Sequence, residues 1–341
     1  MKAIALRTLI CGGALAFLLS VDASNAEEGQ ELAQAAGSSL IGTAAPKLVL
    51  KSIDGEEIDL GSLYGRKAVY LKFWATWCTI CRQQMPHFKR AFLNAGQDLA
   101  VIAVDVDFND SLDAIKAYRR KLDLTMPIVI DDGRLAAALH LRVTPEHIVI
   151  GRDGRILFVG HLIDDQLEAA LVQARQTSRA QVTAQLTANE PKRYGVGAEV
   201  PNISSVTLDG QSILLKDPDG TRPTVLVFLS PWCEEYLAKS RPQRAASCRA
   251  MREQVDVLAK RSHARWLGIS SGLWAKSDEL AAYRDERKVK IPLTLDESGS
   301  LFRTFGVTGV PTVLLVSAKG KIVGRIDRAG PKLKNDLVAL R

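Results

Sequence analysis

Apolar residues recur along the first half of this chain either in short continuous runs or at helical spacing. Continuous runs predict strands covered on both faces, and they lie at 69–74, 99–106, 128–130, 147–150 and 156–159. A spacing of 3.6 residues predicts helices, and it is found at 81–92, 112–121 and 134–140. Alternating strands and helices of this kind predict an α/β fold, a central mixed sheet flanked by helices.

Turn and cap signals extend this pattern at both ends. Asp54-Gly55 lies between two short alternating segments, which predicts a β-hairpin before the first buried run. A helix capped by Asp164 is predicted to continue to about Leu186, because Ala, Gln and Leu recur there at helical spacing. We expect residues 179–196 to form a helical connector.

The second half of the chain repeats the first at matching offsets. Asp54-Gly55 precedes Cys78 by 24 residues, as Asp209-Gly210 precedes Cys233, and each cysteine follows a tryptophan. Matching offsets of this kind indicate two copies of one fold. We therefore predict one domain at 41–178 and a diverged second domain at 197–341.

Residues 1–26 have the pattern of a secretory signal peptide. Lys2 and Arg7 precede an apolar run from Leu9 to Leu19, and small residues lead to Ala26, after which we expect cleavage. An uncleaved membrane anchor is the alternative, although this run is short for a membrane span. Cleavage predicts a periplasmic protein, with residues 27–40 as a flexible tether.

Composition agrees with two ordinary globular domains. The 341 residues are 47% hydrophobic and 24% charged, and the net charge of +7 is spread along the chain. No aromatic-and-basic motif indicates a nucleic-acid partner. Four cysteines follow the predicted leader, an even number that favours pairing in an oxidising compartment. They are Cys78, Cys81, Cys233 and Cys248.

The first two of these cysteines stand where a buried strand meets a predicted helix. The unpaired N–H groups and the dipole of a helix N-terminus stabilise a thiolate at Cys78, and Cys81 lies one turn further along. A pair placed in this way can make and break disulfides.

Three motifs together resemble the thioredoxin fold and, more narrowly, exported TlpA/ResA-type redoxins. They are Phe73-Trp74-Ala75-Thr76-Trp77-Cys78-x-x-Cys81, Met85-Pro86 and Val143-Thr144-Pro145. The resemblance implies a thiol-disulfide oxidoreductase that reduces or exchanges disulfides in envelope proteins. Its expected partners are protein thiols and disulfides, with a membrane protein as candidate electron donor, and it implies no cofactor and no metal.

The resemblance also assigns roles to individual residues. Cys78 would attack a partner disulfide as the thiolate, and Cys81 would resolve the mixed disulfide. Trp77 would flank Cys78 and exclude water, or else serve only as a packing residue. Pro145 would be cis and face the pair, and Thr144 would offer backbone atoms to an extended substrate.

Two positions depart from the pattern of the relatives, which often place a buried acid near the resolving cysteine. Lys72 and Gln84 stand there instead. A charged Lys72 close to the thiols would lower their pKa, unless its side chain reaches the surface. Glu146 is a candidate substitute carboxylate, or a surface or hydrogen-bonding residue. His87 and His147 are alternative proton carriers, or ordinary exposed or packed residues.

The second copy has Tyr236 where the partner cysteine would stand. Its Cys233 could bond to Cys248, which lies in an eleven-residue insertion. A straight helix would hold the two too far apart, so this bond requires a helix break, for which Pro242 is suited. Whether such a bond would be structural or redox-active stays open. Pro311 keeps the cis-proline position.

Two other classes of function remain as alternatives to the oxidoreductase. A thiol peroxidase would use Cys233, since Ser230 matches the peroxiredoxin pattern, although Leu226 does not. A binding or scaffold protein would use the second domain to grip a partner and keep only a residual redox domain.

Overall fold

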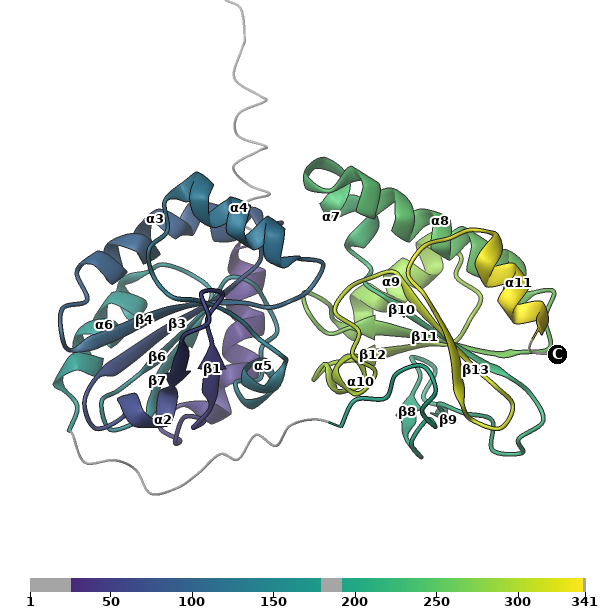
Figure 1. Ribbon diagram of the computed structural model, residues 1–341, viewed down its shortest axis with the longest axis horizontal. Coiled ribbons are helices and arrows are strands. Elements are labelled where there is room, and N and C mark those ends of the chain that lie inside the picture. Colours follow the sequence, from purple (N-terminus) through teal and green to yellow (C-terminus); the bar gives the residue numbers. More distant parts are fainter. Residues whose placement is uncertain (1–25, 179–191, 340–341) are drawn as a thin grey trace, which may run out of the picture.

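The chain folds into two domains that lie side by side, each built on a five-stranded mixed sheet (Figure 1). This computed structural model describes residues 26–178 and 192–339. Helices flank both sheets, so the predicted architecture of two tandem thioredoxin-like domains is confirmed. The predicted signal peptide lies at residues outside those described, apart from its last one.

The first sheet has the order β5-β4-β3-β6-β7. Its strands are β3 (Ala68–Trp74), β4 (Leu99–Asp105), β5 (Ile128–Ile130), β6 (Glu146–Ile150) and β7 (Ile156–Gly160). Strand β3 is central, parallel to β4 and antiparallel to β6. Each of its residues is buried, as its unbroken apolar pattern predicts for a strand covered on both faces.

Short elements and helices complete the first domain. The predicted hairpin consists of β1 (Val49–Lys51) and β2 (Glu57–Asp59), with Gly55 in the left-handed region of its turn. The helices are α2 (Leu60–Leu63), α3 (Thr79–Leu93), α4 (Leu112–Leu122), α5 (Arg134–Ala138) and α6 (Asp165–Gln176). Strand β3 leads directly into α3, which sets the position of the cysteine pair.

The second domain repeats this topology with the sheet order β12-β11-β10-β13-β14. Its strands are β8 (Ser204–Val206), β9 (Ser212–Leu214), β10 (Thr224–Leu229), β11 (Arg265–Ser271), β12 (Leu293–Asp296), β13 (Thr312–Val316) and β14 (Ile322–Ile326). Its helices are α7 (Cys233–Ser240), α8 (Pro242–Ala259), α9 (Ser277–Arg287), α10 (Ser300–Thr304) and α11 (Pro331–Ala339). The eleven-residue insertion falls in the α7–α8 pair, and the break between these helices lies at Pro242, as predicted.

The structure corrects the expectation of a flexible tether at 27–40. Residues 26–37 are helical and lead into the 3-10 helix η1 (Ser38–Leu40). Leu32 and Ala33 are buried in a small cluster with Val143. Its many alanines give this segment a high helix propensity. Its few apolar residues pack against Val143, far away in the chain, and the polar composition of the segment does not reveal such a partner.

Helix α6 ends at Gln176, ten residues before the predicted end. Thr177 is extended, and its hydroxyl donates to the Ala174 carbonyl and accepts from the Arg152 N–H. Of the predicted connector, residues 179–191 lie outside those described, and 192–195 are not helical. Within the described ranges, no helix combines the length and apolar character needed to cross a bilayer.

Candidate active site

Cys78 is the N-cap residue of α3, directly after the buried strand β3 and its turn. The Cys81 N–H donates to Cys78 Sγ over 3.1 Å, and the two cysteines form a disulfide with their Cα atoms 5.2 Å apart. In the reduced state, the same N–H and the helix dipole would stabilise a Cys78 thiolate. Cys81 is fully buried behind it, as a resolving thiol requires.

The loop before β6 brings the predicted substrate-binding residues to this pair. The Thr144–Pro145 peptide bond is cis, and the Thr144 carbonyl oxygen lies 3.3 Å from Cys78 Sγ. Trp77 is 2% exposed, and its Nε1 donates to the Phe108 carbonyl over 2.5 Å. Trp77, Thr144 and Pro145 thus form one face around Cys78, although Thr144 lies 66 positions from Cys78 in the sequence.

Lys72 lies behind the pair and is fully buried. Its Nζ is 3.5 Å from the carbonyl oxygen of Cys81 and 5.7 Å from the centre of the Phe88 ring. Burial holds the pKa of Lys72 well below its ordinary value, and among the described residues no carboxylate forms an ion pair with it. The side chain therefore does not reach the surface, and its amine is held toward the neutral form.

Gln84 connects two buried histidines at the back of this site. Its Oε1 pairs with His147 Nε2 at 2.8 Å, and its Nε2 donates to the His161 carbonyl over 3.0 Å. His147 Nδ1 pairs with the Tyr70 hydroxyl at 2.8 Å. His161 Nδ1 lies 2.6 Å from the carbonyl oxygen of Pro145 and so supports the cis-proline loop.

Both histidines are held neutral by their surroundings. Burial lowers the pKa of His147 well below its ordinary value. Burial also lowers the pKa of His161 to about 4. Sequence reasoning missed His161, because a single histidine after a strand carries no motif that relates it to the cysteines.

The structure does not bring Glu146 or His87 to the cysteine pair. Glu146 stands opposite Phe73 in the sheet, and His147 stands opposite Lys72, so Glu146 lies on the other face from α3. Its carboxylate accepts from the Arg142 N–H at 3.5 Å, and burial raises its pKa. His87 pairs instead with Glu168 on α6.

In the second domain, Cys233 and Cys248 form a disulfide that joins α7 to α8, with Cα atoms 6.3 Å apart. Both cysteines are buried. Because of the disulfide, Cys233 has no free thiol in this state. The Val310–Pro311 bond is cis, which matches the first domain. The Val310 carbonyl accepts from Arg244 over 3.4 Å.

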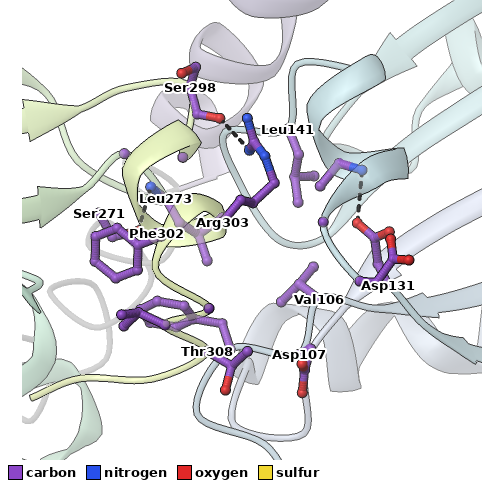
Figure 2. Close-up of a pocket in the computed structure, with 18 of the residues that line it drawn as sticks. Val106, Asp107, Asp131, Leu141, Ser271, Leu273, Ser298, Phe302, Arg303 and Thr308 are labelled. Atoms are coloured by element: carbon purple, nitrogen blue, oxygen red, sulfur yellow. Dashed lines mark hydrogen bonds between the residues drawn. The ribbon is translucent and has the colours of Figure 1, made fainter. Parts of the chain in front are cut away.

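A cavity of about 120 Å³ lies between the two domains (Figure 2). Asp107 and Asp131 contribute from the first domain and Arg303 from the second, and burial raises the pKa of each aspartate to about 6. The Asp131 carboxylate accepts from the backbone N–H groups of Leu135 and Ala136, so it caps α5. Neither active-site cysteine lines this cavity, so we do not place the chemistry here.

Comparison with known proteins supports the same chemistry. The model of the AhpC/TSA family matches residues 41–159, and the Redoxin model matches residues 195–338. A protein named thiol-disulfide oxidoreductase ResA from Bacillus cereus is 31% identical over 135 residues, which cover 38% of this chain and 76% of that protein. The chain belongs to the ResA-like redoxins. It is a thiol-disulfide oxidoreductase.

Two further proteins show similar levels of identity. The thioredoxin-like protein YneN of Bacillus subtilis is 34% identical over 133 residues, covering 38% of this chain and 78% of YneN. The crystal structure of an exposed lipoprotein thioredoxin from Streptococcus pneumoniae covers 38% of this chain and 97% of that one, with 28% identity and a TM-score of 0.34.

Proposed function

We propose that this redoxin is exported and reduces or exchanges disulfides in proteins of the cell envelope through Cys78 and Cys81. The observation that carries the proposal is the position of Cys78, at the N-terminus of α3 and 3.3 Å from the Thr144 carbonyl. The signal-peptide pattern of residues 1–26 supports export. The four cysteines that follow form two disulfides, which suits an oxidising compartment.

The first chemical step joins enzyme and substrate. In the reduced enzyme, the Cys78 thiolate attacks one sulfur of a substrate disulfide; a mixed disulfide forms, and the other substrate sulfur leaves as a thiolate. The backbone of Thr144 lies beside Cys78 and can pair with an extended substrate segment. This would hold the attacked sulfur near the helix N-terminus.

The second step releases the product and gives Lys72 a role. The Cys81 thiol passes its proton to the neutral Lys72 amine, and its thiolate attacks Cys78 Sγ and displaces the second substrate thiolate. The enzyme is left with the Cys78–Cys81 disulfide, and the Lys72 ammonium then returns its proton to solvent or to the product. A buried neutral amine can accept this proton as the buried acid of the relatives would.

Turnover requires that the Cys78–Cys81 disulfide be reduced again. A dithiol protein can do this by the reverse exchange, and a membrane protein with such a dithiol is the candidate electron donor. The same pair without a donor would exchange disulfides rather than reduce them continuously.

Reduction of insulin by the full chain, with dithiothreitol as the donor, tests the proposal. We expect Cys78→Ser to abolish the activity, Cys81→Ser to accumulate a mixed disulfide, and Cys233→Ser to retain activity. Activity that survives Cys78→Ser and disappears in Cys233→Ser would place the chemistry in the second domain and refute the proposal.

The role of Lys72 needs a measurement of the second step alone. In rapid-quench experiments, Lys72→Met should accumulate the mixed disulfide because its resolution slows, by about 100-fold if the amine is the main proton acceptor. Lys89→Met is the matched control, since Lys89 lies on α3 but pairs with Asp123 at the surface. Equal resolution rates in both variants would remove Lys72 from the mechanism.

A further inference from the structure

The redox face of the first domain is covered by the second domain. Cys78 is 1% exposed, although a protein disulfide has to reach its sulfur. The ring of Trp77 stacks on the ring of Trp232, with centroids 5.2 Å apart and planes 29° apart. Each of these tryptophans directly precedes the first cysteine of its own domain, so the two equivalent faces meet.

Trp274 occupies the backbone acceptor beside Cys78. Its Nε1 donates to the Thr144 carbonyl oxygen over 3.2 Å, and this oxygen is the one that lies 3.3 Å from Cys78 Sγ. An extended substrate that pairs with Thr144 would need the same oxygen. Trp274 and such a substrate therefore exclude each other.

Tyr236 makes a similar contact at the start of α3. Its hydroxyl accepts from the Thr79 N–H over 3.2 Å, one residue after Cys78. Tyr236 is the residue that replaces the second cysteine in the repeat. The residue at the position of the second cysteine thus contacts the first turn of α3, between Cys78 and Cys81 of the other domain.

Polar contacts around the covered face hold it in place. Arg241 pairs with Asp110 at 3.3 Å and also bonds to the Thr76 hydroxyl. From the first domain, Arg142 donates to the carbonyl oxygens of Gly272 and Ala275 over 3.1 Å and 2.7 Å. These two carbonyls flank Trp274, so Arg142 fixes the segment that reaches Thr144.

We propose that the second domain is an internal ligand of the redox face, which competes with protein disulfides for the site around Cys78. This proposal rests on the proposed function, since it identifies what occupies the substrate site of that reaction. A substrate binds only the fraction of molecules in which the second domain has moved away, and its apparent affinity is reduced by that fraction. Weakening the contact should therefore lower KM and expose Cys78.

The test measures alkylation of Cys78 by iodoacetamide under conditions that reduce the Cys78–Cys81 disulfide and leave Cys233–Cys248 closed, with peptide mass mapping of all four cysteines. Trp274→Ala and Arg241→Ala should each accelerate alkylation of Cys78, by about tenfold for the tryptophan, and lower KM for insulin more than they change kcat. Trp274→Phe should give a smaller increase, because it removes the N–H donor but keeps an aromatic ring at this position. Arg284→Ala is the control, since Arg284 pairs with Asp209 and Asp285 inside the second domain.

The outcomes separate this proposal from the proposed function. Alkylation rates that match the control in all the Trp274 and Arg241 variants would overturn the internal ligand, whatever the insulin assay shows. Faster alkylation in variants that do not reduce insulin would support the internal ligand and refute the proposed substrate. Circular dichroism of each variant establishes that faster alkylation does not come from unfolding.

Discussion

The Lys72 amine lies 3.5 Å from the Cys81 carbonyl oxygen, in a part of the core where the described residues offer it no carboxylate. A lysine in this setting lowers stability, because folding must hold the amine neutral while the unfolded chain leaves it charged. The pKa of Lys72 is lower in the folded protein than in the unfolded chain, and this sets the sign of the pH dependence. Above the pKa of the unfolded chain, Lys72 does not change the free energy of unfolding. As the pH falls from there toward the pKa in the folded protein, the free energy of unfolding decreases.

Lys72→Met should therefore stabilise the protein near neutral pH, by about 1–3 kcal/mol, and flatten the decrease in unfolding free energy between alkaline and neutral pH. Urea unfolding of the wild type and the variant at several pH values measures this difference. A variant whose curve stays parallel to the wild-type curve would show that the Lys72 amine is charged in the fold.

His161 should affect stability at lower pH. Burial lowers its pKa to about 4 from an ordinary 6.5, so the unfolded chain binds a proton between these values that the folded protein does not. As the pH falls from 6.5 to 4, we expect His161→Gln to gain stability relative to the wild type, on the order of 1–3 kcal/mol. Lys72 and His147 shift in the same direction, so only the difference between variant and wild type reports on His161. A constant difference would contradict the assignment.

Gly29 should be essential for docking of the helix at residues 26–37. A Cβ at Gly29 would lie 2.7 Å from the rings of both His161 and Trp274. Replacing glycine by alanine inside a helix stabilises it by about 1 kcal/mol. We nevertheless expect Gly29→Ala to lower the free energy of unfolding by about 1–3 kcal/mol, because the rings of His161 and Trp274 must move. It should also accelerate alkylation of Cys78, since the helix contacts both domains. Gly195→Ala is the control, because apart from its chain neighbours no atom of the described residues lies within 4 Å of its Cβ position. Equal stability in the two variants would mean that the helix is not docked.

The Cys233–Cys248 bond should support the internal ligand. It ties α7, which carries Tyr236, to α8. Replacing both cysteines by alanine should cost about 3 kcal/mol in the chain-entropy model for a loop of this size, and it should accelerate alkylation of Cys78. Thermal unfolding and the alkylation assay measure the two effects. Loss of stability with an unchanged alkylation rate would make the bond a structural staple that does not affect the redox face.

The strands and helices of the first domain could be predicted from the sequence because local patterns determine them. The apolar run of β3 is buried on both faces, and the Asp-Gly turn closes the β1–β2 hairpin. The matching offsets of the repeat predicted a second copy of this fold, and the second domain has the equivalent sheet order. A polar, Ala-rich segment gives no such signal, so the helix at residues 26–37 was expected to be a tether.

The sequence by itself determined the redox pair, because Cys78 and Cys81 are close in the chain and a strand-to-helix junction positions them. Only the tertiary structure decided what surrounds the pair. The neutral state of Lys72 depends on burial between sheet and helix, and the position of Glu146 depends on which face of β6 it occupies. The contact of Trp274 with Thr144 joins residues 130 positions apart. Such contacts arise from the way two folded surfaces fit together, which local hydrophobic periodicity does not specify.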